Sequence, residues 1–150
     1  MKTELSVRAV HKDGMEVLAS DGQFDMLMDY PLDSGDTGAG PTPLTMLLAS
    51  LAACSLNSVL VVLKRTHQPL AGLEVEARAI RSNKHPTVLT GISLEFTVTG
   101  KNIDSDKVAR ALQMSEDRLC PVWNMLKAGT PIKASFHLQD EPQRAVARAD

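Results

Sequence analysis

Aromatic residues are scarce in this chain of 150 residues, which has one tryptophan, one tyrosine and three phenylalanines. Proteins that bind single-stranded nucleic acid stack bases on aromatic side chains, so a surface of that kind is not expected here. The hydrophobic core is therefore expected to be aliphatic, with the seven methionines as adaptable filler.

An excess of charge of either sign is also missing. The chain has 16 basic and 18 acidic residues, for a net charge of −2. A chain so balanced has no overall electrostatic attraction to nucleic acid or to acidic lipid, and we expect neither partner. With 43% hydrophobic and 23% charged residues, the composition is that of a globular protein rather than a disordered or collagen-like one.

Cysteine is limited to Cys54 and Cys120. Two cysteines so far apart exclude a disulfide-scaffolded miniprotein and a zinc site of the CxxC type. The four histidines are scattered without the spacing of metal ligands, so we expect no metal and no other cofactor. The N-terminal residues MKTELSVRAV lack the apolar core of a signal peptide, which predicts a cytoplasmic protein.

Residues 43–63 contain no charged residue, and they are rich in leucine, alanine and valine. By length alone the stretch could cross a membrane. Five polar residues interrupt it, and the amphipathic strands predicted elsewhere need a helix to cover them. We therefore predict a buried helix and no membrane association. A helix that is apolar on every face must itself be covered, and a second subunit is the simplest cover.

Hydrophobic periodicity predicts the remaining elements. Strands are expected at residues 4–10, 14–20, 23–28, 73–79, 88–98 and 131–139, and helices at 43–65, 104–113 and 115–128. The long loop 29–43 is rich in glycine and proline. The resulting order, βββ–α–ββ–α(α)–β, predicts an α+β fold with a buried central helix. Residues 1–140 are predicted to form a single domain, and residues 141–150 a frayed tail.

Each cysteine has a distinct helical context. On a helix, Ser50, Asn57 and Ser58 share a face with Cys54, so the thiol lies in a narrow polar stripe. The stripe fits either a reactive thiol or a packing seam of small residues, and the sequence leaves both open. Cys120 follows a predicted helix start at Ser115 and comes close after Arg118. The helix dipole and this guanidinium could both favour a thiolate.

Two other motifs are weaker evidence for a function. A nucleophilic pair of Cys54 with His67 or His137 would suit a hydrolase, but no motif supports it. The segment GDTGAG at residues 35–40 resembles a phosphate-binding loop without the lysine that such loops carry.

Two longer segments resemble the OsmC/Ohr-like family. GPTPLTMLLASLAACSLNSVL at residues 40–60 is similar to the family's first signature, in which a proline-containing loop leads into a buried helix with a cysteine. SLEFTVTGKNIDSDKVARALQMSEDRLCPVWNML at residues 93–126 is similar to the second, which ends in another cysteine. The segment SDGQFDMLMDYP before the loop also matches.

The resemblance implies an intertwined homodimer with two active sites at the subunit interface. It also implies a thiol peroxidase that reduces organic hydroperoxides in stress defence. Cys54 would attack the peroxide, and Cys120 would resolve the resulting sulfenic acid as a disulfide, which an unknown dithiol reductant would then reduce.

One departure from the family pattern bears on activity. The peroxidases of the family carry a glutamate nine or ten residues before the first cysteine, where this chain has Thr45 and Leu44. They also use an upstream arginine, but no arginine lies between Arg8 and Arg65. The chain therefore resembles a divergent branch without the Arg–Glu pair. The alternative to a peroxidase is a non-enzymatic protein of the same fold that binds a hydrophobic ligand or senses redox state.

Overall fold

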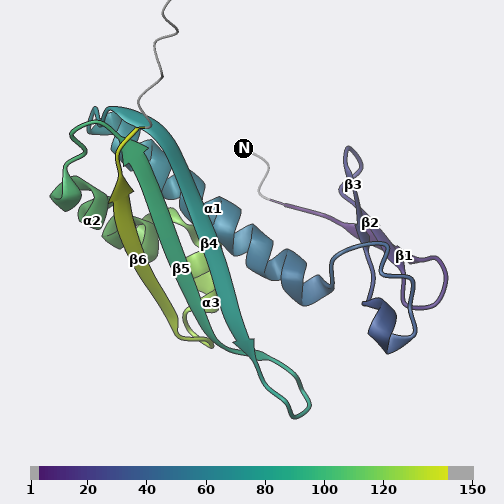
Figure 1. Cartoon of the computed structure of the whole chain (residues 1–150). Helices are drawn as coiled ribbons and strands as arrows, with labels where there is room; N and C mark the ends of the chain where they lie inside the picture. The colour runs from purple at the N-terminus through teal and green to yellow at the C-terminus, as the bar shows by residue number, and fades with distance from the viewer. Residues whose placement is uncertain (1–3, 142–150) are drawn as a thin grey trace, which may run out of the picture. The chain divides into compact units, whose positions relative to one another are not determined.

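The computed structural model describes residues 4–141, which form two compact units (Figure 1). Among the described residues, one unit comprises residues 4–47 and the other residues 48–141, and the boundary falls inside the long helix α1. The order of elements is that predicted from the sequence, so the α+β class is confirmed. That residues 1–140 act as a single domain stays a prediction. Residues 142–150 of the predicted frayed tail lie outside the described residues.

The first unit is built on three antiparallel strands, β1 (Arg8–His11), β2 (Val17–Ser20) and β3 (Asp25–Met28), in the order β1-β2-β3. All three are shorter than predicted: β1 begins four residues later and ends one residue later, whereas β2 and β3 begin later because the turns before them take up more residues. In the first turn, Glu16 N–H donates to the Asp13 carbonyl at 2.7 Å. In the second, the Asp21 carboxylate accepts hydrogen bonds from the backbone of Gln23 and Phe24 at 2.9 and 2.7 Å.

The predicted loop is organised around one buried carboxylate, that of Asp29. It accepts hydrogen bonds from Thr37 Oγ1 at 2.6 Å, Ala39 N at 3.1 Å and Tyr30 N at 2.8 Å. The Thr37 hydroxyl is the main cause that lowers the pKa of Asp29 below its usual value. The backbone amide of Ala39, inside the GDTGAG segment, is thus taken by a carboxylate of the chain itself. A short 3-10 turn, η1 (Leu32–Ser34), lies within the same loop.

Helix α1 (Pro43–Arg65) has the predicted bounds. It begins with Pro43, whose missing N–H is of no consequence in the first turn. It ends with Lys64 and Arg65, which suit the negative end of the helix dipole. By length and composition α1 could also cross a membrane. Only 28% of its most apolar 18-residue window, with mean hydropathy 2.2, is buried within the chain.

The second unit is built on the sheet β4-β5-β6, with β4 (Leu70–Arg81) antiparallel and β6 (Ile132–Gln139) parallel to the central β5 (Leu89–Gly100). The predicted alternation along β5 is confirmed. Its inward side chains are fully or nearly fully buried: Ile92, Leu94, Phe96 and Val98. Val88, predicted to continue this face, lies outside the strand and is 52% exposed. Figure 1 shows the helices of this unit on one face of the sheet.

The segment before Cys120 differs from the prediction. Asp104 caps α2 (Ser105–Met114), but Ser115 does not start a new helix. Ser115 keeps helical dihedrals, and the chain continues through one wide π-helical turn, η2 (Ser115–Leu119). The next helix, α3 (Pro121–Leu126), begins six residues later than predicted and ends two residues before Ala128. The restart falls at Pro121 because proline has no N–H for the preceding turn and fits the first helical position.

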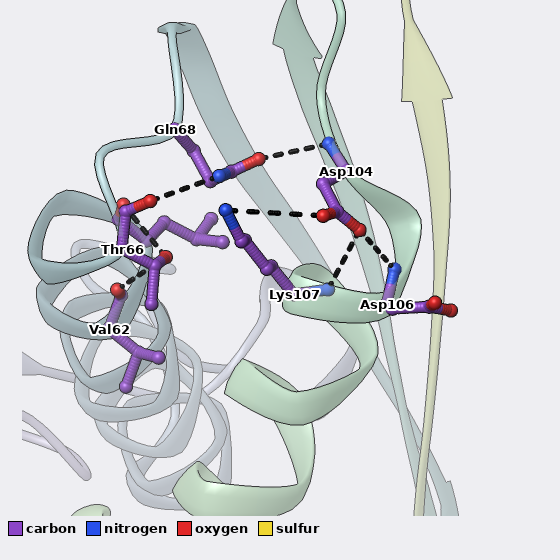
Figure 2. A network of polar contacts seen from close by, with 7 residues as sticks. Val62, Thr66, Gln68, Asp104, Asp106 and Lys107 are labelled. Carbon is purple, nitrogen blue, oxygen red and sulfur yellow. Dashed lines mark hydrogen bonds and ion pairs between the residues drawn. The ribbon is translucent and has the colours of Figure 1, made fainter.

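A polar network ties the end of α1 to the start of α2 (Figure 2). Gln68 bridges them, since its Nε2 donates to the Thr66 carbonyl at 3.1 Å while its Oε1 accepts from Asp104 N at 2.9 Å. Asp104 in turn caps α2 by accepting from Asp106 N and Lys107 N at 3.0 and 3.3 Å. One side chain thereby fixes the spacing of the two helices at this end of the unit.

Candidate active site

The structure brings the two cysteines together. Cys54 lies in the middle of α1 and is half-buried, whereas Cys120 lies immediately before α3 and is fully buried. Their Sγ atoms are 2.9 Å apart, in a hydrogen-bond geometry with Cys120 as the donor. Both are free thiols. Residues 66 positions apart in the chain therefore form a dithiol pair.

The serine hydroxyls next to Cys54 on α1 are bonded to the backbone of their own helix. Ser55 Oγ donates to the Ala52 carbonyl at 3.0 Å, and Ser58 Oγ donates to the Cys54 carbonyl at 2.9 Å. Both hydroxyls thus bond back to their own helix rather than to the thiol, which lets α1 approach its neighbours closely. Ser50 and Asn57 are exposed.

Cys120 is the N-cap residue of α3, and its Sγ accepts a hydrogen bond from Trp123 N at 3.3 Å. Burial is the main cause that raises the pKa of Cys120 to about 11, and the hydrogen bond to Cys54 adds to it. The expectation that the helix dipole and Arg118 favour a thiolate at Cys120 is therefore wrong. The Trp123 amide does lower the pKa, but burial outweighs it, and the Arg118 side chain is exposed.

Comparison with known proteins identifies the family of this chain. The family model described as "OsmC-like protein" matches residues 35–135. The chain belongs to the OsmC-like family. The protein YhfA of Escherichia coli K12 is 33% identical over 113 residues, which cover 75% of this chain and 81% of YhfA.

Solved structures agree on the fold. An OsmC-like protein from Mycoplasma pneumoniae is similar with a TM-score of 0.79 at 22% identity, covering 92% of this chain and 99% of that one. The organic hydroperoxide resistance protein OhrB of Bacillus subtilis is similar with a TM-score of 0.63 at 19% identity, covering 89% of this chain and 98% of that one.

The dithiol belongs to the apolar core of this OsmC-like chain. Cys120 is part of that core, Cys54 packs against it, and the core also includes Leu51, Leu94, Phe96 and Trp123. Within the described residues, two buried polar atoms lack a hydrogen-bond partner, Ser115 Oγ and Trp123 Nε1. Sequence reasoning missed Trp123. The signal was available in the order Cys-Pro-Val-Trp, because a residue before a proline that starts a helix is its N-cap, and the third helical residue donates to it.

The histidines do not join the site. All four are exposed, and within residues 4–141 no hydrogen bond links either cysteine to a histidine. His137 instead bonds Thr97 Oγ1 through Nε2 at 2.8 Å, far along the sheet. Over the same range, no three residues among His, Cys, Asp and Glu are grouped to hold a metal.

Proposed function

We propose that this protein is a thiol-dependent peroxidase that reduces organic hydroperoxides. One observation carries the proposal, the 2.9 Å separation between the sulfur atoms of a half-buried Cys54 and a fully buried Cys120. Membership of the OsmC-like family supports it, as does the fold shared with proteins described as organic hydroperoxide resistance proteins.

The chemistry proceeds in three steps. The Cys54 thiolate attacks the outer oxygen of the hydroperoxide and becomes a sulfenic acid, while the O–O bond breaks and the alkoxide takes a proton from water. The Cys120 sulfur then attacks the sulfenic sulfur, which forms the disulfide and releases water. A dithiol reductant returns both cysteines to thiols and leaves as its own disulfide.

The same proposal includes a homodimer in the cytoplasm. Only 28% of the most apolar 18-residue window of α1 is buried within its own chain, and a second copy would cover the rest. Light scattering of the purified protein at micromolar concentration is expected to give the mass of a dimer. A stable monomer, or a chain recovered only with membranes, would contradict this part.

The test of activity is stopped-flow consumption of cumene hydroperoxide and hydrogen peroxide. Wild type is expected to consume cumene hydroperoxide faster than hydrogen peroxide, because the surroundings of the dithiol are apolar. Cys54→Ser removes the attacking sulfur and should abolish consumption. Cys120→Ser should allow a single turnover, with Cys54 trapped as sulfenic acid or oxidised further. Equal rates in wild type and Cys54→Ser would refute the proposal.

The second candidate is a non-enzymatic protein of the same fold that binds a hydrophobic ligand or senses redox state. It is favoured by Thr45 and Leu44, which stand where the family's peroxidases carry glutamate, and by the absence of an arginine between Arg8 and Arg65. Mass spectrometry distinguishes the two. If no disulfide forms with peroxide and both thiols are unreactive, the binding function stands instead.

A further inference from the structure

Within residues 48–141, no cationic side chain is hydrogen-bonded to Cys54. The charged residues of β4, β5, β6 and α2 are all exposed, the strand side chains that form the core with α1 are apolar, and α3 has no charged residue. The η2 turn carries Glu116, Asp117 and Arg118, but no hydrogen bond or ion pair in the described part of the chain joins any of them to either sulfur. On α1 itself, Lys64 and Arg65 come ten or more residues later, at its far end.

Among the described residues, the one hydrogen-bond partner of Cys54 Sγ is the thiol of Cys120, at 2.9 Å. Cys120 is fully buried, and its pKa of about 11 keeps it protonated at neutral pH. The sulfur of Cys120 already accepts a hydrogen bond from Trp123 N at 3.3 Å. Its own S–H is therefore free to point at Cys54, and of the two sulfurs Cys54 is the one with access to solvent.

We propose that the Cys120 S–H group donates a hydrogen bond to Cys54 Sγ and thereby stabilises the Cys54 thiolate. Cys120 is then a positioning residue before any oxidation, in addition to its proposed role in resolving the sulfenic acid. The inference deepens the proposed function and rests on it, because attack on a peroxide requires a thiolate. Hydrogen bonds to the charged form of a group favour that form, and those with an ionised partner are the stronger ones.

Two substitutions separate the donor from the sulfur. Cys120→Ser keeps a hydroxyl donor at the same position, and Cys120→Ala removes the donor. In both variants Cys54 is the only cysteine, so its alkylation by iodoacetamide can be followed from pH 6 to pH 9 without interference from a second thiol. Mass spectrometry resolves the two sites in wild type.

In Cys120→Ala, alkylation of Cys54 at pH 7 is expected to slow about tenfold, and the rate–pH profile should move about one unit towards higher pH. In Cys120→Ser, the alkylation rate of Cys54 at pH 7 should stay within about threefold of the wild-type rate. Absorbance at 240 nm, which reports thiolate directly, should follow the same order. Thermal melts confirm that each variant is folded, since alanine is a poorer N-cap than serine.

Equal profiles for Cys120→Ala and Cys120→Ser, whether both fast or both slow, would overturn the inference, because the donor is what differs between them. This outcome is independent of the peroxidase test, since alkylation uses no peroxide. If no hydroperoxide is consumed but alkylation slows only in Cys120→Ala, the proposed function fails and the hydrogen bond stands. If peroxide is consumed and the two rate–pH profiles coincide, the hydrogen-bond inference fails and the proposed function stands.

Discussion

Oxidation by peroxide should make this protein measurably more stable to heat. A disulfide between Cys54 and Cys120 closes a loop across 66 residues. In the chain-entropy account, cross-linking a loop of that length removes unfolded-state freedom worth about 4 kcal/mol. Small native-state adjustments subtract from this gain, because the two sulfurs must move from hydrogen-bond to bonding distance. A net gain of about 2–4 kcal/mol corresponds, for a chain of this size, to a rise in Tm of roughly 5–15 °C.

The assay is differential scanning calorimetry of reduced and peroxide-treated protein, with the disulfide quantified by mass spectrometry in the same sample. Cys120→Ser treated in the same way is the control, and its Tm should not rise. A disulfide that forms but lowers the Tm would show that the sulfurs meet only when the surrounding core is distorted. That result would refute the argument that α1 and α3 already hold the pair in place.

Three further predictions concern the framework. Gly100→Ala should lower the Tm by about 3–10 °C, because a Cβ there would overlap the Pro69 carbonyl oxygen and lie 2.7 Å from Ile103 Cδ1. The control is Gly91→Ala in the same strand, which should leave the Tm unchanged because no atom lies within 4 Å of the added Cβ. Asp104→Ala should destabilise the fold by about 1 kcal/mol in urea titrations, since α2 loses its cap. Because folding lowers the pKa of Asp29, its ionised carboxylate stabilises the folded state above the pKa that Asp29 has in the unfolded chain. This stabilisation is lost as pH falls through the lower pKa of the folded state. Below pH 4, the Tm of wild type should therefore fall more steeply with pH than the Tm of Asp29→Asn.

Much of the fold could be predicted because hydrophobic period is a local property. The alternation along β5 was predictable since this strand is central and one of its faces lies against the helices. The edge strand β6 shows the limit of the same rule. Its pattern predicts four inward residues, but only Ile132 and Phe136 are half-buried, while Ala134 and Leu138 are exposed. An edge strand has a neighbouring strand on one side only. Its own sequence does not indicate how far the helices extend over it, and therefore which of its side chains they bury.

The start of the last helix shows what local signals miss. A serine followed by two acidic residues is a sound pattern for an N-cap, and Ser115-Glu116-Asp117 has it. The deciding facts are not local, because Ser115 is fully buried and the chain stays helical through it. The residue that does cap the helix, Cys120, is a cysteine, which cap preferences do not include. The two cysteines could be paired by resemblance to a family, but their contact depends on how α1 and α3 pack.

The burial of Cys120 fits the order of steps in the proposed cycle. Burial raises the pKa of Cys120 to about 11, so Cys120 is protonated at pH 7 and is a poor target for peroxide in solution. The same burial would make it a slow resolving group if its partner were distant. Holding the sulfurs 2.9 Å apart offsets this, because well-oriented intramolecular reactions reach effective concentrations on the order of 10⁵ M or more. In the proposed cycle, this arrangement would direct peroxide to Cys54 and still let Cys120 react once a sulfenic acid had formed beside it.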